Sequence, residues 1–73
     1  MPATLVHVGE RLRRLRTLNA LTQAQLAERA GLAESAVARA ERDETEPHMT
    51  TIRKLAEALG VQPRELIEGG DDA

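Results

Sequence analysis

Aromatic residues and cysteine are both absent from this 73-residue sequence. Aromatic side chains are enriched in β-strands and stack on bases in sheet-based RNA-binding modules, so their absence argues against a β-rich fold and against an OB-fold. Without cysteine, the chain has no disulfide framework and no cysteine-based zinc site. The histidines, His7 and His48, lie far apart with no carboxylate at a ligand-like spacing, so we expect no metal and no cofactor.

Long apolar runs are absent as well. No stretch is long enough to span a bilayer, and the N-terminus lacks the continuous apolar segment of a signal peptide. We therefore expect a soluble cytoplasmic protein that forms one domain over residues 1–73, with a core of Leu, Ile, Val, Ala and Met. Ser35 is the only serine and no histidine–carboxylate pair has a useful spacing, which argues against an enzyme.

The net charge of −2 conceals an asymmetry between the two halves of the chain. Residues 1–42 carry seven arginines and four glutamates, whereas residues 43–73 carry three basic and eight acidic side chains. A basic half within an acidic chain favours a polyanionic partner. Charge alone leaves open the alternative that both halves simply have solvated faces.

Apolar residues at helical spacing predict three short helices in the first half of the chain. The first covers roughly residues 5–18. The second begins after Thr22, an N-cap residue with Gln25 three positions later, and ends at Gly31, which supplies the left-handed residue of a helix terminus. The third covers residues 34–42 and follows Ala33, which is a poor N-cap.

Two further helices are predicted after a loop at residues 43–48, where Pro47 disfavours helical geometry in the preceding residue. Apolar positions from Met49 to Leu59 indicate a fourth helix that stops at Gly60. A fifth, short helix begins at Pro63, which suits a first helical turn. We expect residues 69–73 to be a frayed acidic tail.

The segment LTQAQLAERAGLAESAVARAE, residues 21–41, resembles the helix-turn-helix of the lambdoid-phage Cro and repressor family, the xenobiotic-response-element regulators. The resemblance extends to Arg16 upstream and to Pro47 and LAEALGV (55–61) downstream, and it covers roughly residues 8–68. It implies an all-α, compact, five-helix lambda-repressor-like DNA-binding domain whose helix-turn-helix core spans about 22–42. In such a motif the tight turn lets the second helix enter a major groove, which explains the early Gly31.

The resemblance also implies roles for individual residues. Thr22 and Gln23 match positions that bind DNA phosphate at a helix N-terminus, and Thr22 is at the same time a cap. Arg39 matches a position that faces base edges, where an arginine pairs with guanine, although a solvated arginine is the alternative. Other positions that match base-facing ones are Glu34, Ser35 and Ala36; Glu34 is equally well explained as an acid in the first turn of a helix.

Arg16 and Glu41 match the family's buried ion pair between the first helix and the end of the recognition helix. Arg42 and His48 match positions that contact the DNA backbone, and His48 has the alternative role of capping the fourth helix. The sequence departs from the family pattern in its loop. Asp43 replaces the usual Gly, and two acids, Glu44 and Glu46, stand where relatives often carry Lys or Arg.

These features predict a sequence-specific transcriptional regulator, a repressor or Cro-like controller that binds double-stranded DNA as a homodimer on a palindromic site. The dimer contact is expected near the fifth helix, at Val61, Leu66 and Ile67, unless these residues close the core of the monomer instead. The alternative is a protein-interaction module, antitoxin-like or antirepressor-like, on the same scaffold, which the acidic loop favours.

Overall fold

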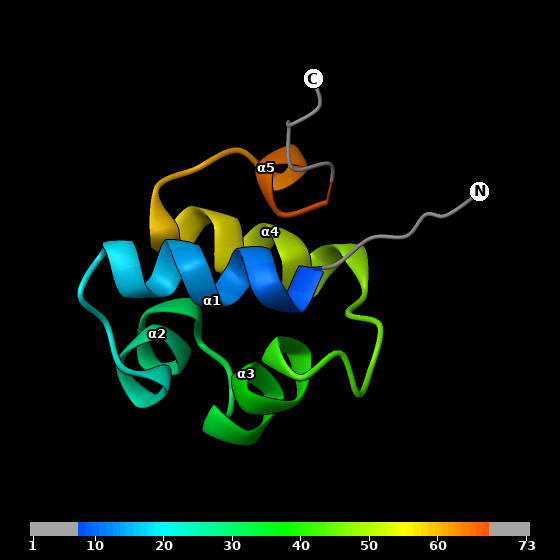
Figure 1. Ribbon diagram of the computed structural model, residues 1–73, viewed down its shortest axis with the longest axis horizontal. Coiled ribbons are helices and arrows are strands. Elements are labelled where there is room, and N and C mark those ends of the chain that lie inside the picture. The colour runs from blue at the N-terminus through cyan, green and yellow to red at the C-terminus, as the bar shows by residue number, and fades with distance from the viewer. Residues whose placement is uncertain (1–7, 68–73) are drawn as a thin grey trace.

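The computed structural model describes residues 8–67 of the protein. They form five helices: α1 (Val8–Leu18), α2 (Gln23–Ala30), α3 (Glu34–Glu41), α4 (Met49–Leu59) and α5 (Pro63–Ile67). Helices α2 and α3 lie on one side of α1 and α4, and α5 lies on the opposite side (Figure 1). The predicted all-α, five-helix fold is confirmed. The expected first residues of α1, 5–7, and the expected tail, 69–73, lie outside the described residues.

The core receives one fully buried large side chain from every helix. These side chains are Leu12, Leu26, Val37, Leu55 and Leu66. Smaller residues fill the space between them, and Ala27 and Ala40 allow α2 and α3 to pack closely. A core built from aliphatic side chains contributed by five short helices depends on all of them, because none buries enough apolar surface alone.

The three residues expected at a dimer contact divide between two environments. Leu66 has no exposed surface and packs in the core between α5 and its neighbours. It therefore closes the core of the monomer and is not available for a dimer contact. Val61 and Ile67 are half-buried and pack against the edge of the core while they keep part of their surface exposed. Of the three residues, only Val61 and Ile67 could contribute apolar surface to a contact with a second copy.

Helices α1 to α4 all end with the same backbone arrangement, in which one residue adopts a left-handed conformation. These residues are Ala20, Gly31, Asp43 and Gly60. At each end the next residue donates its N–H to a carbonyl five positions earlier, as Leu32 does to Ala27 at 2.8 Å. This is the Schellman arrangement, and it satisfies carbonyl groups that the end of a helix leaves without partners.

The turn between α2 and α3 is short because both helices have defined ends. Thr22 and Gln25 form a capping box at the start of α2: the Thr22 hydroxyl accepts from Gln25 N at 3.0 Å, and the Gln25 side chain accepts from Thr22 N at 2.9 Å. Gly31, with φ of +72°, reverses the chain, and Ala33 leads into α3 without any side-chain cap. The predicted turn is therefore present, and α3 is free to point in a new direction.

The first turn of α1 lies directly against the end of α3. Asp43 Oδ1 accepts a hydrogen bond from Gly9 N at 3.0 Å, which satisfies a free N–H at the start of α1. A Cβ at position 9 would lie 2.5 Å from the Glu41 carbonyl oxygen and 2.8 Å from that of Ala40. Gly9 therefore permits this approach, and Asp43 fixes it.

None of the helices formed by residues 8–67 has the length and apolar character that crossing a membrane requires.

Candidate functional site

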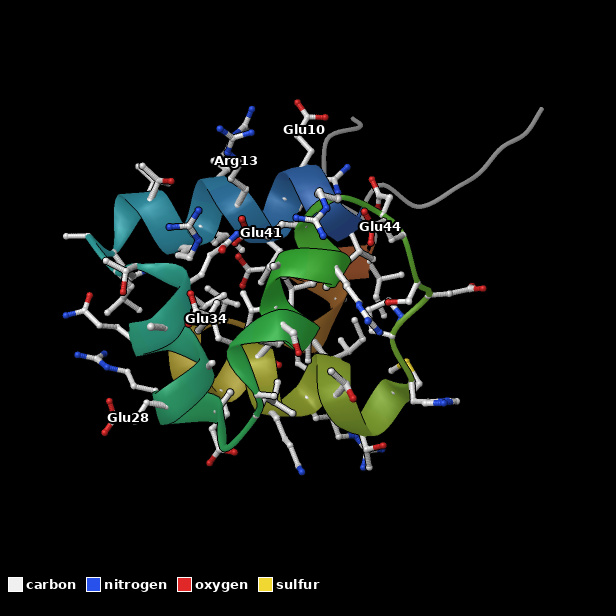
Figure 2. The ribbon with its side chains drawn as sticks, turned by 90° about the horizontal axis from the view of Figure 1, so that it is seen from below. Glu10, Arg13, Glu28, Glu34, Glu41 and Glu44 are labelled. Carbon is white, nitrogen blue, oxygen red and sulfur yellow. The ribbon has the colours of Figure 1, made fainter. Side chains whose placement is uncertain are left out.

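The outer face of α3 carries three polar side chains opposite its buried residues. Val37 and Ala40 point into the core. Ser35, Arg39 and Arg42 recur at intervals of four and three residues, so they share the opposite face, and all three are exposed. Figure 2 views the molecule from this side, with α3 in front of α1 and α4. The face is therefore a ridge with one hydroxyl and two guanidinium groups.

Glu34 and Ala36, the other α3 residues expected at base edges, lie on the flanks of this ridge, and Ala38 lies there as well. Glu34 is exposed in the first turn of the helix, where a carboxylate also interacts favourably with the helix dipole. Ala36 and Ala38 are half-buried, one on each side. Their small side chains keep α3 narrow, so the arginines stand clear of the helix.

The start of α2 lies beside the same face. Thr22 is exposed, and although its oxygen accepts the N–H of Gln25, its hydroxyl proton remains available to donate. Gln23 is half-buried and its Nε2 donates to Glu41 Oε1 at 3.0 Å, which leaves the second N–H of the amide for another acceptor. Both residues can therefore cap or brace the fold and still donate to an anion.

A network centred on Glu41 connects α1, α2 and α3. Arg16 Nε donates to Glu41 Oε2, and Arg16 Nη2 donates to Oε1 at 3.0 Å. The third guanidinium nitrogen of Arg16 donates to the Leu21 carbonyl at 2.8 Å, which holds the segment before α2. Figure 2 shows Glu41 between α1 and α3. Together with Gln23, these contacts fix the end of α3 relative to the two helices beside it.

This ion pair is well shielded from water on its acidic side. The side chain of Glu41 is 4% exposed and that of Arg16 is 16% exposed. The hydrogen bonds to Glu41 raise the pKa of Arg16 above its ordinary value, although burial acts in the opposite direction. Burial of the Glu41 carboxylate without hydrogen-bond donors would destabilise the fold. Glu41 therefore depends on its contacts with Arg16 and Gln23.

Arg42 forms a second ion pair, but on the surface. Its Nε donates to Glu44 Oε2 at 2.7 Å, and the side chains of Arg42 and Glu44 are 60% and 50% exposed. The hydrogen bond that Arg42 donates to Glu44 lowers the pKa of Glu44 and raises the pKa of Arg42. The arginine expected to contact the DNA backbone is therefore already occupied by an acid of the loop.

His48 occupies the N-cap position of α4 with an extended backbone conformation, but its side chain makes no capping hydrogen bond. The imidazole is exposed, so the structure does not show the capping role that the sequence left open. The candidate site thus gathers Thr22, Gln23, Ser35 and Arg39 around α2 and α3, with Arg42 and His48 on either side of the loop.

Sequence reasoning missed three contacts of the site, and two of them have no direct signal in the sequence. The hydrogen bond from Gln23 to Glu41 spans 18 residues and that from Gly9 to Asp43 spans 34, so neither follows from helical spacing. The Arg42–Glu44 pair is local, and an acid two residues after a helix-ending arginine is the pattern that indicates it. The chain reversal at Asp43 brings the two side chains together.

No group of three or more His, Cys, Asp or Glu side chains within residues 8–67 is arranged to hold a metal ion.

Comparison with known proteins places this geometry in a family. Residues 12–66 match the helix-turn-helix family. The restriction-modification controller protein C.AhdI from Aeromonas hydrophila has 45% sequence identity and a TM-score of 0.81, with 85% of this chain and 94% of that chain covered. The P22 c2 repressor, in a structure with a synthetic operator, has 35% identity and a TM-score of 0.81, with 90% and 98% covered.

A curated relative gives the same answer from sequence. The immunity repressor protein of Bacillus phage phi105 is 42% identical over 60 residues, which are 82% of this chain and 42% of the repressor. The chain thus spans less than half of that relative's length. The match to the family over residues 12–66, together with the α2–turn–α3 geometry, shows that the chain belongs to the helix-turn-helix family, as the resemblance to phage Cro and repressor proteins implied.

Proposed function

We propose that this protein is a sequence-specific DNA-binding transcriptional regulator that inserts α3 into the major groove. One observation carries this proposal most strongly: the outer face of α3 presents Ser35, Arg39 and Arg42 in one line, on a helix narrowed by alanines and opposite its buried side. An α-helix fits the major groove, and arginine is the side chain that most often reads guanine there.

The exposed residues of α3 are expected to differ in how well they discriminate between bases. Arg39 lies in the middle of the exposed face, and among residues 8–67 no ion pair occupies it, so it is the proposed contact to guanine O6 and N7. Ser35 can bond to several bases and specifies little. Glu34 could accept from cytosine N4, and Ala36 offers apolar contact to a thymine methyl group.

Residues around α3 are proposed to contact the sugar–phosphate backbone. Thr22 and Gln23 stand at the N-terminus of α2, where free N–H groups and the helix dipole favour an anion. Arg42 and His48 flank the loop on the other side of α3. Contacts on both sides of the recognition helix would fix its register in the groove without reading sequence.

Such a regulator is proposed to act as a repressor or Cro-like controller, in the cytoplasm, as a homodimer. A single α3 reads few base pairs, so specificity calls for two copies on a palindromic operator with half-site centres about 34–36 Å apart. The half-buried Val61 and Ile67 are the proposed dimer contact. The names of the P22 c2 repressor and of the phage phi105 immunity repressor support this role.

Selection of bound duplexes from a random library, followed by sequencing, tests the proposal directly. We expect a palindromic motif with two half-sites, and affinity for random duplex that falls steeply as salt concentration rises. The loop acids Glu44 and Glu46 support the alternative of a protein-interaction module. Enrichment of no motif, together with no binding at low salt, would favour that alternative.

A further inference from the structure

The surface ion pair at the end of α3 lies inside the proposed DNA interface. Arg42 follows the last residue of the recognition helix, on the same face as Arg39. Its guanidinium contacts both carboxylate oxygens of Glu44, at 2.7 Å from Nε and 3.4 Å from Nη2. Figure 2 shows Glu44 beside the end of α3 and close to the start of α1.

The backbone of the turn places Glu44 where it can make this contact. Asp43 adopts a left-handed conformation, with φ of +57°. This turns the chain back, and Glu44 N donates to the Arg39 carbonyl at 3.0 Å. Asp43 is held in turn by its hydrogen bond to Gly9 N. These two hydrogen bonds fix the backbone of Glu44 beside the last turn of α3, so its carboxylate lies within reach of Arg42.

A guanidinium group binds a carboxylate and a phosphate in the same way, through two parallel N–H donors. Glu44 thus occupies the position on Arg42 that a DNA phosphate would take. We propose that Glu44 is an internal competitor of the DNA backbone for Arg42, and that Arg42 must exchange Glu44 for a phosphate when the protein binds DNA. This inference rests on the proposed function, because it assigns a restraint to that same interface.

The exchange is feasible because the pair is exposed. An exposed ion pair stabilises a protein little, since water already solvates both groups well. A phosphate held by the other contacts of the interface can therefore displace Glu44, at a modest loss of affinity. Competition through Arg42 differs from general repulsion, which any nearby acid exerts on DNA. Glu46 supplies the comparison: it is an exposed acid of the same loop and forms no ion pair within residues 8–67.

Four variants and the wild-type protein test the inference by fluorescence anisotropy with a random-sequence duplex at low salt. They are E44Q, E46Q, R42Q and the double variant R42Q/E44Q. E44Q and E46Q each remove one negative charge from the loop. We expect E44Q to tighten binding about two- to fivefold more than E46Q does, the range that an exposed ion pair supports. When Arg42 is glutamine, we expect the added E44Q change, measured as R42Q/E44Q against R42Q, to tighten binding no more than E46Q tightens the wild type.

Two results would overturn the inference while the proposed function stands. Equal tightening by E44Q and E46Q would mean that Glu44 acts only through general repulsion. An excess that persists in R42Q/E44Q would mean that Glu44 does not act through Arg42. If neither wild-type protein nor E44Q binds duplex DNA at low salt, the proposed function itself fails. Thermal melting of each variant verifies that the comparison is made between folded proteins.

Discussion

Glu41 is the residue on which the hydrogen bonds of the candidate site converge. It accepts from Arg16 and from Gln23, and its side chain is 4% exposed. The family resemblance implied the pair with Arg16, because both residues stand at matching positions. It did not imply the contact with Gln23, which was expected only at a phosphate. Glu41 therefore supports both the fold and the position of a residue at the proposed interface.

Replacement of Glu41 by alanine should lower the free energy of unfolding by about 1–3 kcal/mol, because it leaves shielded donors of Arg16 and Gln23 without an acceptor. Chemical denaturation measures this difference. E46A is the matched control, since Glu46 is an exposed glutamate in the loop that follows α3 and should change stability little. A similar effect in both variants would contradict the role given to Glu41.

Replacement of Arg39 by alanine should weaken binding to the selected duplex by about 1–3 kcal/mol and relax base preference at one position of each half-site. The physical reason is the loss of two hydrogen bonds to one guanine. Competition binding with duplexes substituted at every position measures both effects. Uniform weakening at all positions would indicate that Arg39 contacts phosphate and reads no base.

The Arg42–Glu44 pair makes a prediction about titration. The hydrogen bond and charge of Arg42 lower the pKa of Glu44 from its ordinary value of 4.5, so R42Q should raise it towards that value. A lowered pKa means that the pair's contribution to folding is present above pH 4.5 and is lost as the pH falls through the lower, native value. NMR titration of side-chain carboxyl carbons measures this, and an unchanged Glu44 pKa in R42Q would show that the pair does not form in solution.

At the scale of elements, some helix ends are predictable from the sequence and others are not. Gly31 and Gly60 mark helix ends plainly, because glycine adopts the left-handed conformation without steric cost. Ala20 adopts it as well, against its intrinsic preference. Asp43, which stands where the family usually has Gly, adopts it too. The Asp43 side chain also accepts a hydrogen bond from Gly9 N, and this contact between residues 34 positions apart does not follow from the local sequence.

Two substitutions by glycine should therefore differ in sign or size. A20G removes the strain of a left-handed alanine and should raise the free energy of unfolding by about 1 kcal/mol. D43G relieves similar strain but also removes the acceptor of Gly9 N, which lies in the tightest contact between α1 and α3. Denaturation of both variants measures the difference. An equal gain in both would show that the Asp43 hydrogen bond contributes nothing.

Local patterns predicted the order of the helices and the turn before α3, since capping residues and apolar spacing act over a few positions. Contacts between distant residues were not predictable in the same way. Leu66 illustrates this: its apolar side chain suited either a dimer surface or the core, and only its position against the other helices decides for the core. The pairs of Gly9 with Asp43 and of Gln23 with Glu41 depend on the same packing.

At the scale of the whole molecule, α1, α4 and α5 form a support that holds one exposed ridge. The arginines of the first half of the chain include the two on the outer face of α3, whereas many of the acids lie in the loop and beyond it. Figure 2 also shows Glu28 turned away from α3 at the far edge of α2. The overall negative charge therefore leaves Arg39 and Arg42 on this face, although Glu34 and Glu44 lie beside them.

The central claim is that the outer face of α3 and the start of α2 contact DNA. Titration of ¹⁵N-labelled protein with the selected duplex, followed through its backbone amide signals, tests it most directly. We predict that the largest shifts fall at Gln23, Ser35, Arg39 and Arg42, while amides of α5 that face away from the duplex change little. Shifts concentrated on α4 and α5, with α3 unaffected, would contradict the account.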